Sequence, residues 1–447
     1  MNLLTSPLLT DLYQLTMMQG YVDEGMHEEA VFEFYVRSLP PSRGFLVAAG
    51  LDTLLAFLEG MRFTEEELKY IAGMGRFSPA LLDYLTEIRF RGDVYAMAEG
   101  TVFFENEPVV RVVAPMPEAQ LIETRLINIL HFETLIASKA ARCMLAADDR
   151  AVLIDFGVRR SHGAEAGLLA ARDSYIAGFA GTSTVLAEAI YGIPIFGTMA
   201  HSYVEAHGDE LEAFLSFARA NPNNTTLLID TYDVHKGAKK AVEAAKILKE
   251  AGIIVRAVRL DSGDLLALSK DVREILDQAG LTDVRIFASG NLDEYAIRAL
   301  LSRGAPINGF GVGTKLDTSE DAPYMECAYK LMEYAGTPRF KKSEGKATIP
   351  GRKQVFRQFD NRTMVRDILT IEGDEIEGTA LLAKVMSGGK RRVSERRELK
   401  EIAAYTRSQL NALPAHFRRL ETTPPYSVKI SPALSRIEHE SERRLGL

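Results

Sequence analysis

Between residues 150 and 315, one pattern of apolar and polar positions recurs along the chain. A short apolar run ends in polar residues or glycine, and a stretch with helical periodicity separates it from the next run. The apolar runs are AVLIDFG, IPIFGTMAHS, TLLID, IIVRAVRLDSGD, VRIFASGN and INGFGVGT. Continuously apolar strands that alternate with helices are typical of a parallel sheet covered on both faces. The pattern therefore predicts an α/β unit.

The helices of this unit are clearest in residues 237–251 and 264–279, where apolar residues recur every three or four positions. Asn291 is expected to cap a further helix, with Glu294 three residues later as its capping-box partner. A doubly wound sheet and an α/β barrel both fit the alternation. Polar groups at nearly every strand end favour the barrel, whose site gathers at the carboxyl ends of its strands.

The flanking regions have a different periodicity. Residues 90–114 and 327–373 show the alternation and turn residues of antiparallel strands, and residues 118–147 show a helical pattern. We expect an N-terminal α/β domain, the barrel with the active site, and a C-terminal part that packs on the N-terminal domain. The boundaries that we predict for these three parts are 1–128, 129–325 and 326–447.

The composition excludes several classes of protein. Of 447 residues, 47% are hydrophobic and 26% charged, as in ordinary globular proteins. A net charge of -8 argues against a broad surface for nucleic acid or anionic membrane. Two distant cysteines give no disulfide framework, and the chain shows neither a signal-peptide pattern nor an apolar run of about 18 residues. We expect a cytoplasmic enzyme or ligand-binding protein.

The predicted strand ends are rich in arginine, carboxylate, hydroxyl and glycine. They carry Asp155, Arg159, Arg160, His162, Thr198, His201, Asp230, Asp233, Arg259, Asp261, Ser262, Asp264, Ser289, Asn291, Thr314 and the alternating glycines of GFGVGT. Glycine backbone and arginine bind phosphate, and carboxylates bind sugar hydroxyls or Mg²⁺. Each feature alone also fits a turn or a helix cap. Their recurrence at successive strand ends indicates one site for a phosphate-bearing polyol.

Two of the eight histidines lie close together in GTMAHSYVEAHGDELEAF. His201 and His207 are six positions apart, which is not the spacing of two metal ligands on one helix face. His207 is expected at the surface. His201 follows a strand end, where it is a candidate base, phosphate ligand or nucleophile for a phosphoryl group. Residue chemistry alone leaves these three roles open.

The chain resembles the nicotinate phosphoribosyltransferase family over most of its length. The matching stretches include LLTDLYQLTMMQGY, ETRLINILHFETLIASKAAR, DFGVRRSHGAEAG, AGFAGTSTVLA, GTMAHSYV, LLIDTYD, VRLDSGDL, FASGNLDE and GVGTKL. The resemblance implies an irregular TIM-like α/β barrel of the type II phosphoribosyltransferases, with an α/β-sandwich-like domain built from both ends of the chain. It implies synthesis of nicotinate mononucleotide and pyrophosphate from nicotinate and phosphoribosyl pyrophosphate, with Mg²⁺ and ATP hydrolysis, in NAD salvage.

The resemblance also implies roles for individual residues. His201 matches the histidine that ATP phosphorylates, and Tyr13 matches an aromatic residue that reaches the site of a neighbouring subunit in a homodimer. The other positions implied for nicotinate are Phe156, Ser183, Thr198 and Arg259. Those implied for phosphoribosyl pyrophosphate are Arg159, Asp261, Ser262, Gly263, Asp264, Ser289, Gly290, Gly311, Gly313 and Thr314. No residue is assigned as a metal ligand.

Ser183 bears on the choice of substrate. Related nicotinamide phosphoribosyltransferases carry an aspartate at this position, which accepts a hydrogen bond from an amide and repels a carboxylate. Serine removes the repulsion and favours nicotinate. The alternatives are a phosphoribosyltransferase for nicotinamide or quinolinate, which ATP dependence and substrate choice would distinguish, and a non-catalytic phosphate-binding barrel, which has no need of His201.

Overall fold

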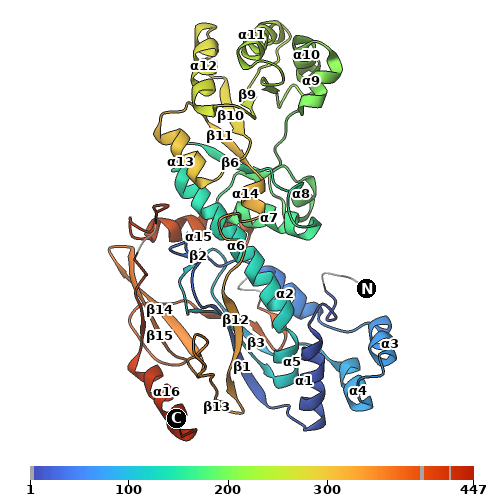
Figure 1. The fold of residues 1–447 in the computed structure, drawn as a ribbon, viewed down its shortest axis with the longest axis vertical. Coiled ribbons are helices and arrows are strands. Elements are labelled where there is room, and N and C mark those ends of the chain that lie inside the picture. The colour runs from blue at the N-terminus through green and yellow to red at the C-terminus, as the bar shows by residue number, and fades with distance from the viewer. Residues whose placement is uncertain (1–4, 393–396, 422–423, 447) are drawn as a thin grey trace. The chain divides into compact units, whose positions relative to one another are not determined.

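The computed structural model describes residues 5–392, 397–421 and 424–446 (Figure 1). The chain forms two compact units. The first, here called the terminal unit, comprises Met1–Ser138 and Tyr324–Leu447. The second, here called the barrel unit, comprises Lys139–Pro323. Helix α6 (Glu123–Ala147) begins in the terminal unit and ends in the barrel unit.

The terminal unit is built on a seven-stranded sheet in the order β13-β12-β1-β5-β3-β17-β18. Its central strand β1 (Glu29–Val36) pairs antiparallel with β5 (Pro108–Pro115) and with β12 (Cys327–Tyr334). The N-terminal and C-terminal parts of the chain thus share one sheet, as predicted. The remaining strands are β3 (Asp93–Ala96), β13 (Thr337–Pro338), β17 (Ala383–Ser387) and β18 (Lys390–Arg391).

Two smaller sheets and seven further helices complete the described part of the terminal unit. The four-stranded sheet has the order β16 (Thr379–Ala380), β14 (Lys353–Asp360), β15 (Thr363–Ile371) and β19 (Val428–Ile430), and β2 (Leu46–Val47) pairs with β4 (Val102–Phe103). The helices are α1 (Leu12–Asp23), α2 (Leu51–Gly60), α3 (Glu65–Gly73), α4 (Pro79–Glu87), α5 (Met116–Leu121), α15 (Leu399–Ala412) and α16 (Pro432–Arg444). The helical run predicted for 118–147 is therefore two helices, α5 and α6.

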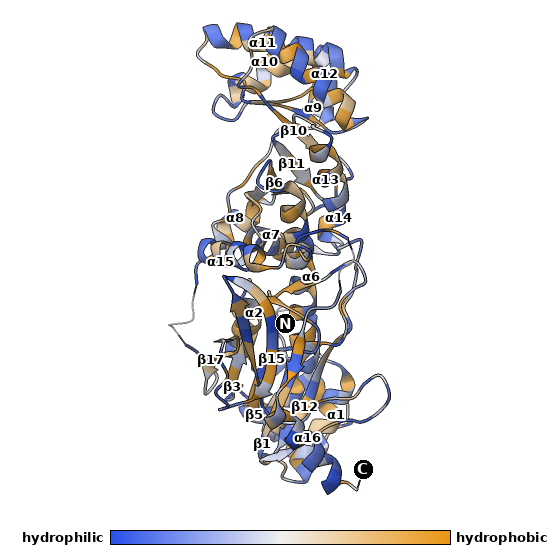
Figure 2. Cartoon of the chain, turned by 90° about the vertical axis from the view of Figure 1, so that its left-hand side faces the viewer, coloured by the Kyte–Doolittle hydropathy of each residue, from blue (hydrophilic) through white to orange (hydrophobic). Residues whose placement is uncertain are grey.

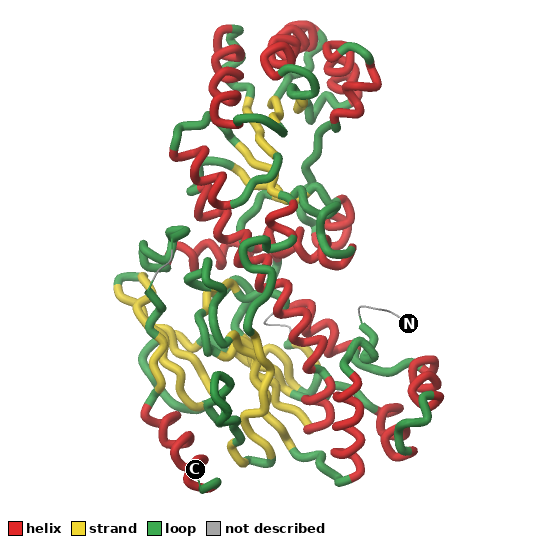
Figure 3. Tube along the Cα trace, viewed as in Figure 1, coloured by secondary structure: helices red, strands yellow, loops and turns green. Residues whose placement is uncertain are grey.

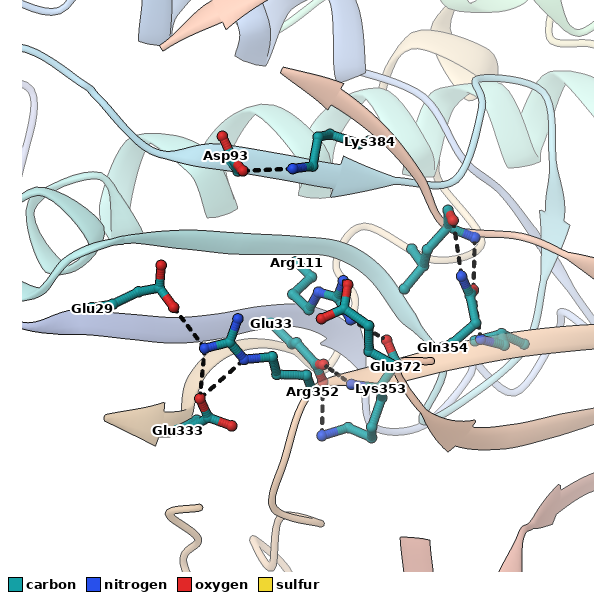
Figure 4. Close-up of polar contacts among 12 residues, drawn as sticks. Glu29, Glu33, Asp93, Arg111, Glu333, Arg352, Lys353, Gln354, Glu372 and Lys384 are labelled. Carbon is teal, nitrogen blue, oxygen red and sulfur yellow. Dashed lines mark hydrogen bonds and ion pairs between the residues drawn. The ribbon is translucent and has the colours of Figure 1, made fainter. Parts of the chain in front are cut away.

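A buried ion pair links the seven-stranded sheet to the four-stranded sheet (Figure 4). Nζ of Lys353 on β14 lies 2.8 Å from Oε2 of Glu33 on β1, and both side chains are nearly inaccessible to solvent. Arg111 on β5 donates to the backbone oxygen of Lys353 at 2.8 Å and pairs with Glu372 after β15. Burial lowers the pKa of Lys353, and the charge of Glu33 opposes that shift.

The barrel unit contains a six-stranded parallel sheet in the order β7-β6-β11-β10-β9-β8. Its strands are β6 (Val152–Asp155), β7 (Gly181–Thr182), β8 (Thr226–Leu228), β9 (Ala257–Leu260), β10 (Arg285–Ser289) and β11 (Gly309–Val312). Strands β6 and β11, the first and last in sequence, are neighbours in the sheet. This is the neighbour relation of a barrel, in which the last strand pairs with the first.

The two edges of this sheet are joined by one short segment. Thr182 at the end of β7 forms a parallel bridge with Ile195, and Thr198 donates a hydrogen bond at 2.5 Å to the backbone oxygen of Thr226 in β8. The segment 195–198 therefore joins the two edges through one backbone bridge and one side-chain hydrogen bond, and it stands where a regular barrel has another strand. The predicted irregular TIM-like α/β barrel is confirmed in this form.

Helices follow the strands of the barrel unit (Figure 3). They are α7 (Ala164–Ile176), α8 (Val185–Tyr191), α9 (His201–His207), α10 (Glu210–Ala220), α11 (Val234–Glu250), α12 (Leu265–Gln278), α13 (Glu294–Ser302) and α14 (Thr314–Asp317). Helices α11 and α12 confirm the predicted periodic stretches. Hydrophilic residues cover much of α11 and α16 in the view of Figure 2, as expected for helices with one exposed face.

The predicted cap of α13 is wrong. The N-cap is Asp293, whose carboxylate accepts a hydrogen bond from the backbone N–H of Ala296 at 2.8 Å. Asn291 instead has a φ of +49°, in the left-handed region, so the chain is still turning there. In the described ranges, no helix is both long and apolar enough to span a bilayer.

Candidate active site

The carboxyl ends of β8, β9 and β10 bring a guanidinium, a carboxylate and hydroxyl groups together in the barrel unit. Arg259 donates through Nη2 to Oδ1 of Asp261 at 2.7 Å and through Nε to Oγ of Ser289 at 2.8 Å. Ser289 also donates to the same oxygen of Asp261. The three side chains form a closed triangle, so the position of each is fixed by the other two.

Asp261 is held in its ionised form by this arrangement. Partial burial alone raises the pKa of Asp261, but the hydrogen bond from Ser289 and the charge of Arg259 outweigh burial and bring the pKa below its usual value. Oδ2 of Asp261 is not used in the triangle and lies 3.9 Å from Nε2 of His201. The site therefore presents a carboxylate oxygen and an imidazole nitrogen side by side.

His201 is the first residue of α9, and its side chain is 37% exposed. Its Nδ1 lies 3.1 Å from the hydroxyl oxygen of Thr231, which follows β8. One ring nitrogen is thus engaged with the protein and the other faces Asp261. The sequence did not single out Thr231 as a site residue. Its position next to Asp230, in the strand-end motif DTYD, is the feature of the sequence that could have indicated it.

Asp230 supports the loop after β9. Its Oδ2 accepts hydrogen bonds from the backbone N–H of Asp261 at 2.8 Å and from the hydroxyl of Ser262 at 2.7 Å. Its Oδ1 is buried and has no hydrogen-bond partner within the described ranges. The sequence places Asp230 at a strand end without a specific role, and the structure shows that it holds the loop that carries Asp261 and Ser262.

Phe156, directly after β6, packs beneath the guanidinium of Arg259. The Cζ atom of Arg259 lies 5.6 Å from the centre of the Phe156 ring. A Cβ atom on Gly311 would lie 2.5 Å from this ring, so the glycine gives the ring its space. Gly311 was expected to bind phosphate through its backbone N–H group. It is buried within β11, so its N–H group is not exposed to a ligand. Phe156 remains half-buried and available for stacking on a ligand ring.

The other glycines and capping residues expected at the phosphates lie in exposed or half-exposed loops. Gly290 has a φ of +99°, and a Cβ atom there would lie 2.2 Å from the backbone oxygen of Asp261. Gly313 is half-buried and Thr314 is exposed at the start of α14. Gly263 also has a positive φ, +78°, and Asp264 caps α12 by accepting from the backbone N–H groups of Leu266 and Ala267.

The remaining expected residues lie on three different segments. Arg159 is exposed in the loop after β6, and Ser183 is half-buried after β7, where its backbone N–H donates to the oxygen of Asp155 at 2.8 Å. The hydroxyl of Thr198 is used in closing the barrel. Tyr13 belongs to the terminal unit, where it lies on α1 with 47% of its surface exposed. His207 is half-buried at the end of α9, in contact with Tyr203.

The fold and the site define a class of protein, an α/β barrel whose strand ends present carboxylate, guanidinium, imidazole and hydroxyl groups to a polar ligand. Comparison with known proteins then gives the family. Residues 8–131 match the nicotinate phosphoribosyltransferase N-terminal domain, residues 151–365 the nicotinate phosphoribosyltransferase family, and residues 375–438 the C-terminal domain. The chain belongs to the nicotinate phosphoribosyltransferase family.

Individual relatives agree with this assignment. The chain is 49% identical over 437 residues to a nicotinate phosphoribosyltransferase of Mycobacterium tuberculosis, covering 97% of this chain and 94% of that protein. It is 42% identical over 358 residues to the Bacillus subtilis nicotinate phosphoribosyltransferase, covering 78% and 72%. The crystal structure of human nicotinic acid phosphoribosyltransferase superposes with a TM-score of 0.86 at 28% identity, covering 96% and 99%.

A second solved structure shows the same fold in another enzyme. The nicotinate-nucleotide pyrophosphorylase of Pyrococcus furiosus superposes with a TM-score of 0.74 at 26% identity, covering 91% of this chain and 95% of that one. The barrel architecture is therefore shared between proteins with different names. Substrate choice has to be argued from the residues of the site.

Proposed function

We propose that the protein is a nicotinate phosphoribosyltransferase that forms nicotinate mononucleotide and pyrophosphate from nicotinate and phosphoribosyl pyrophosphate, coupled to ATP hydrolysis, in NAD salvage. The observation that carries the proposal is the cluster of His201, Arg259 and Asp261 at the strand ends of a chain from this family. A barrel that only bound phosphate would need neither a histidine held at one nitrogen nor a carboxylate beside the other.

The chemical step requires the protein to position the two substrates and to stabilise the charge that develops during transfer. The bond between C1 of the ribose and pyrophosphate breaks through an oxocarbenium-like state, and the ring nitrogen of nicotinate forms the new bond to C1. Asp261 would bind the ribose hydroxyls in its ionised form. Phe156 would stack on the pyridine ring of nicotinate. Arg259, whose guanidinium lies over the Phe156 ring, would pair with the carboxylate of nicotinate.

ATP coupling is proposed to pass through His201. With a hydrogen on Nδ1 donated to Thr231, the lone pair of Nε2 is free to attack the γ-phosphorus of ATP. The new N–P bond forms as the bond to the ADP oxygen breaks. The phosphoryl group adds negative charge beside the site, which favours binding of Mg²⁺ and pyrophosphate, and its later hydrolysis to inorganic phosphate favours release of the products.

Mg²⁺ is proposed to enter with the pyrophosphate. Among the described side chains, no three His, Cys, Asp or Glu residues converge as a ready-made metal site. Mg²⁺ commonly keeps several waters and binds through substrate phosphates with one or two carboxylates, so the available carboxylates fit that mode. The ion would neutralise the charge of the departing pyrophosphate.

A homodimer with shared sites is proposed from exposed apolar side chains. Leu9, Leu12 and Tyr13 near the start of α1 are 45%, 46% and 47% exposed. Val185, Leu186 and Ile190 on α8 are 68%, 56% and 53% exposed. Neighbouring apolar side chains in water are typical of interfaces, and Tyr13 would then cover the pyridine ring in the partner.

We also propose a cytoplasmic location, which the two free cysteines support.

The test is phosphoribosyl transfer by the purified protein with nicotinate, nicotinamide and quinolinate in parallel, each with and without ATP. The proposal expects transfer to nicotinate and stimulation by ATP. The matched variant His201→Ala is expected to keep some ATP-independent transfer and to lose the stimulation. Preferred turnover of nicotinamide or quinolinate, or no transfer with any of the three, would contradict the proposal.

A further inference from the structure

Two carboxyl groups that the proposed reaction does not use lie together inside the barrel unit. Asp155 ends β6 and is 0% exposed, and Asp317 ends α14 and is 1% exposed. Both carboxyl groups lie against Gly157, and Oδ1 of Asp317 is buried with no hydrogen-bond partner among the described residues. A Cβ atom on Gly157 would lie 2.0 Å from Oδ1 of Asp317, so the carboxyl group of Asp317 rests directly on that glycine. We call Asp155 and Asp317 the carboxyl pair.

The carboxyl pair accepts hydrogen bonds from segments that carry, or lie next to, expected substrate contacts. Asp155 accepts from the backbone N–H of Gly157 at 2.7 Å and from the hydroxyl of Thr182 at 2.6 Å. Asp317 accepts from the hydroxyl of Ser161. Phe156 and Arg159 lie on the first of these loops, Ser183 follows Thr182, and Thr314 begins the helix that Asp317 ends. Three segments of the site therefore meet at one buried contact.

We propose that Asp155 and Asp317 share one proton and act as positioning residues that hold the loop after β6 against the segment around α14. The shared proton gives the pair a hydrogen bond where two ionised carboxylates would repel each other. Loss of that proton would leave two negative charges in contact and separate the loops that carry Phe156 and Thr314. This inference rests on the proposed function, because those loops matter for activity only if they bind the substrates.

The electrostatic surroundings of the carboxyl pair agree with one shared proton. Burial and the charge of Asp155 raise the pKa of Asp317 to about 9, and burial also raises the pKa of Asp155. The hydrogen bond from Ser161 acts in the opposite direction on Asp317. The pair thus carries one negative charge at neutral pH and a second one only in alkaline solution.

Other charged groups on the elements around the carboxyl pair either have partners of their own or lie at the surface. Arg172 and Asp173 on α7 lie 3.6 Å apart. Lys315 on α14 pairs with Asp293 at 2.7 Å and with Glu320 at 3.5 Å. Arg159, Arg160 and His162 in the loop after β6 are the groups that lie exposed to water. The proton on the carboxyl pair is therefore the change expected to dominate this contact between pH 6 and pH 9.

The test compares the wild type with Asp317→Asn. The amide can donate to Asp155 and its oxygen can accept from Ser161, so it imitates the protonated carboxyl and does not titrate. In the wild type, the folded state holds a proton that the unfolded chain has lost above pH 4 or so, which makes stability fall as pH rises toward 9. As pH rises, the melting temperature of wild type should therefore fall relative to that of Asp317→Asn. The difference should grow by on the order of a few degrees per pH unit.

Leu316→Val is the matched control, because Leu316 is buried on the same short helix and carries no charge. It is expected to lower the melting temperature by a similar amount at every pH. Asp317→Asn should keep the KM for phosphoribosyl pyrophosphate within about threefold of wild type at pH 7 and remove its rise in alkaline solution. Asp317→Leu, which cannot bond to either partner, should raise this KM by about tenfold or more, with a smaller change in kcat.

The outcomes separate this inference from the proposed function. A melting gap that does not change with pH would overturn the shared proton, whether or not the protein transfers phosphoribosyl groups. A widening gap in a protein that transfers to none of the three pyridines would support the carboxyl pair and contradict the proposed function. If Asp317→Leu does not fold, the pH dependence of wild type and Asp317→Asn still decides between these outcomes.

Discussion

Nδ1 of His201 lies 3.1 Å from the hydroxyl oxygen of Thr231. His201 begins α9 and Thr231 follows β8, so the contact joins two strand-end segments of the barrel unit. A histidine that accepts a phosphoryl group needs one nitrogen with a free lone pair and a ring that does not rotate. Thr231 can provide both conditions by holding the hydrogen of Nδ1 and leaving Nε2 toward Asp261.

Thr231→Val should therefore weaken ATP coupling more than transfer itself. Valine keeps the shape of threonine and removes the hydroxyl, so the ring loses one hydrogen bond worth about 1 kcal/mol. We expect the ATP stimulation to fall roughly two- to tenfold, with little change in the rate without ATP. Thr231→Ser retains the hydroxyl and is the control. Equal losses with and without ATP would show that Thr231 supports the site in another way.

Ser183→Asp should reduce the preference for nicotinate over nicotinamide. Ser183 is half-buried directly after β7, two residues from Gly181, where a Cβ atom would contact the ring of Phe196. A carboxylate at position 183 would repel the carboxylate of nicotinate and accept from the amide of nicotinamide. We expect kcat/KM for nicotinate to fall at least about tenfold. Ser183→Asn, which has a similar shape without the charge, should retain more of the preference.

Gly290→Ala should damage the loop that supports Asp261. The residue needs a φ of +99°, and the new Cβ atom would lie 2.2 Å from the backbone oxygen of Asp261. We expect a loss of about 2 kcal/mol or more in stability and a raised KM for phosphoribosyl pyrophosphate. The control is Gly280→Ala, since Gly280 has a φ of +74° and open space around its Cβ position. That variant should cost about 1 kcal/mol and leave the KM unchanged.

Much of the barrel unit could be predicted from its sequence because its signals are local. Five of the six strands of its sheet are short apolar runs that end in polar residues or glycine, and α11 and α12 show their helical period directly. The prediction missed β7 (Gly181–Thr182), and the run IPIFGTMAHS forms only a single bridge. The closing segment 195–198 could not be predicted in detail. Its closure depends on a bridge to Thr182 and on a hydrogen bond from Thr198 to Thr226, and neither contact leaves a periodic pattern.

The sequence could predict which residues gather at the strand ends, but it could not predict all of their contacts. Arg259, Asp261 and Ser289 lie at strand ends, so their meeting follows from the parallel order of β9 and β10. The role of Gly311 was not accessible, because only the fold shows that the ring of Phe156 occupies the space of its missing side chain. The carboxyl pair was also missed, since Asp155 and Asp317 are far apart in sequence and the chain around Asp317 gives no sign of burial.

Lys353→Met should test how far the buried ion pair stabilises the terminal unit. Lys353 lies 2.8 Å from Glu33 and also donates to the backbone oxygens of Ile349 at 2.6 Å and Gly351 at 3.2 Å. Its removal would leave the carboxylate of Glu33 buried without its partner, which typically costs about 3–5 kcal/mol. Denaturant unfolding of the full chain, followed by a probe in the terminal unit, measures this loss.

The double variant Glu33→Gln with Lys353→Met separates the charge effect from lost packing. Glutamine removes the unpaired charge and keeps an oxygen for the backbone N–H of Lys353, which donates to Glu33 at 3.0 Å. If the uncompensated charge is the main cost, the double variant should be more stable than Lys353→Met alone by about 1–3 kcal/mol. Simple addition of the two single losses would instead mean that each residue contributes through its own packing, because independent contributions add and a broken ion pair does not.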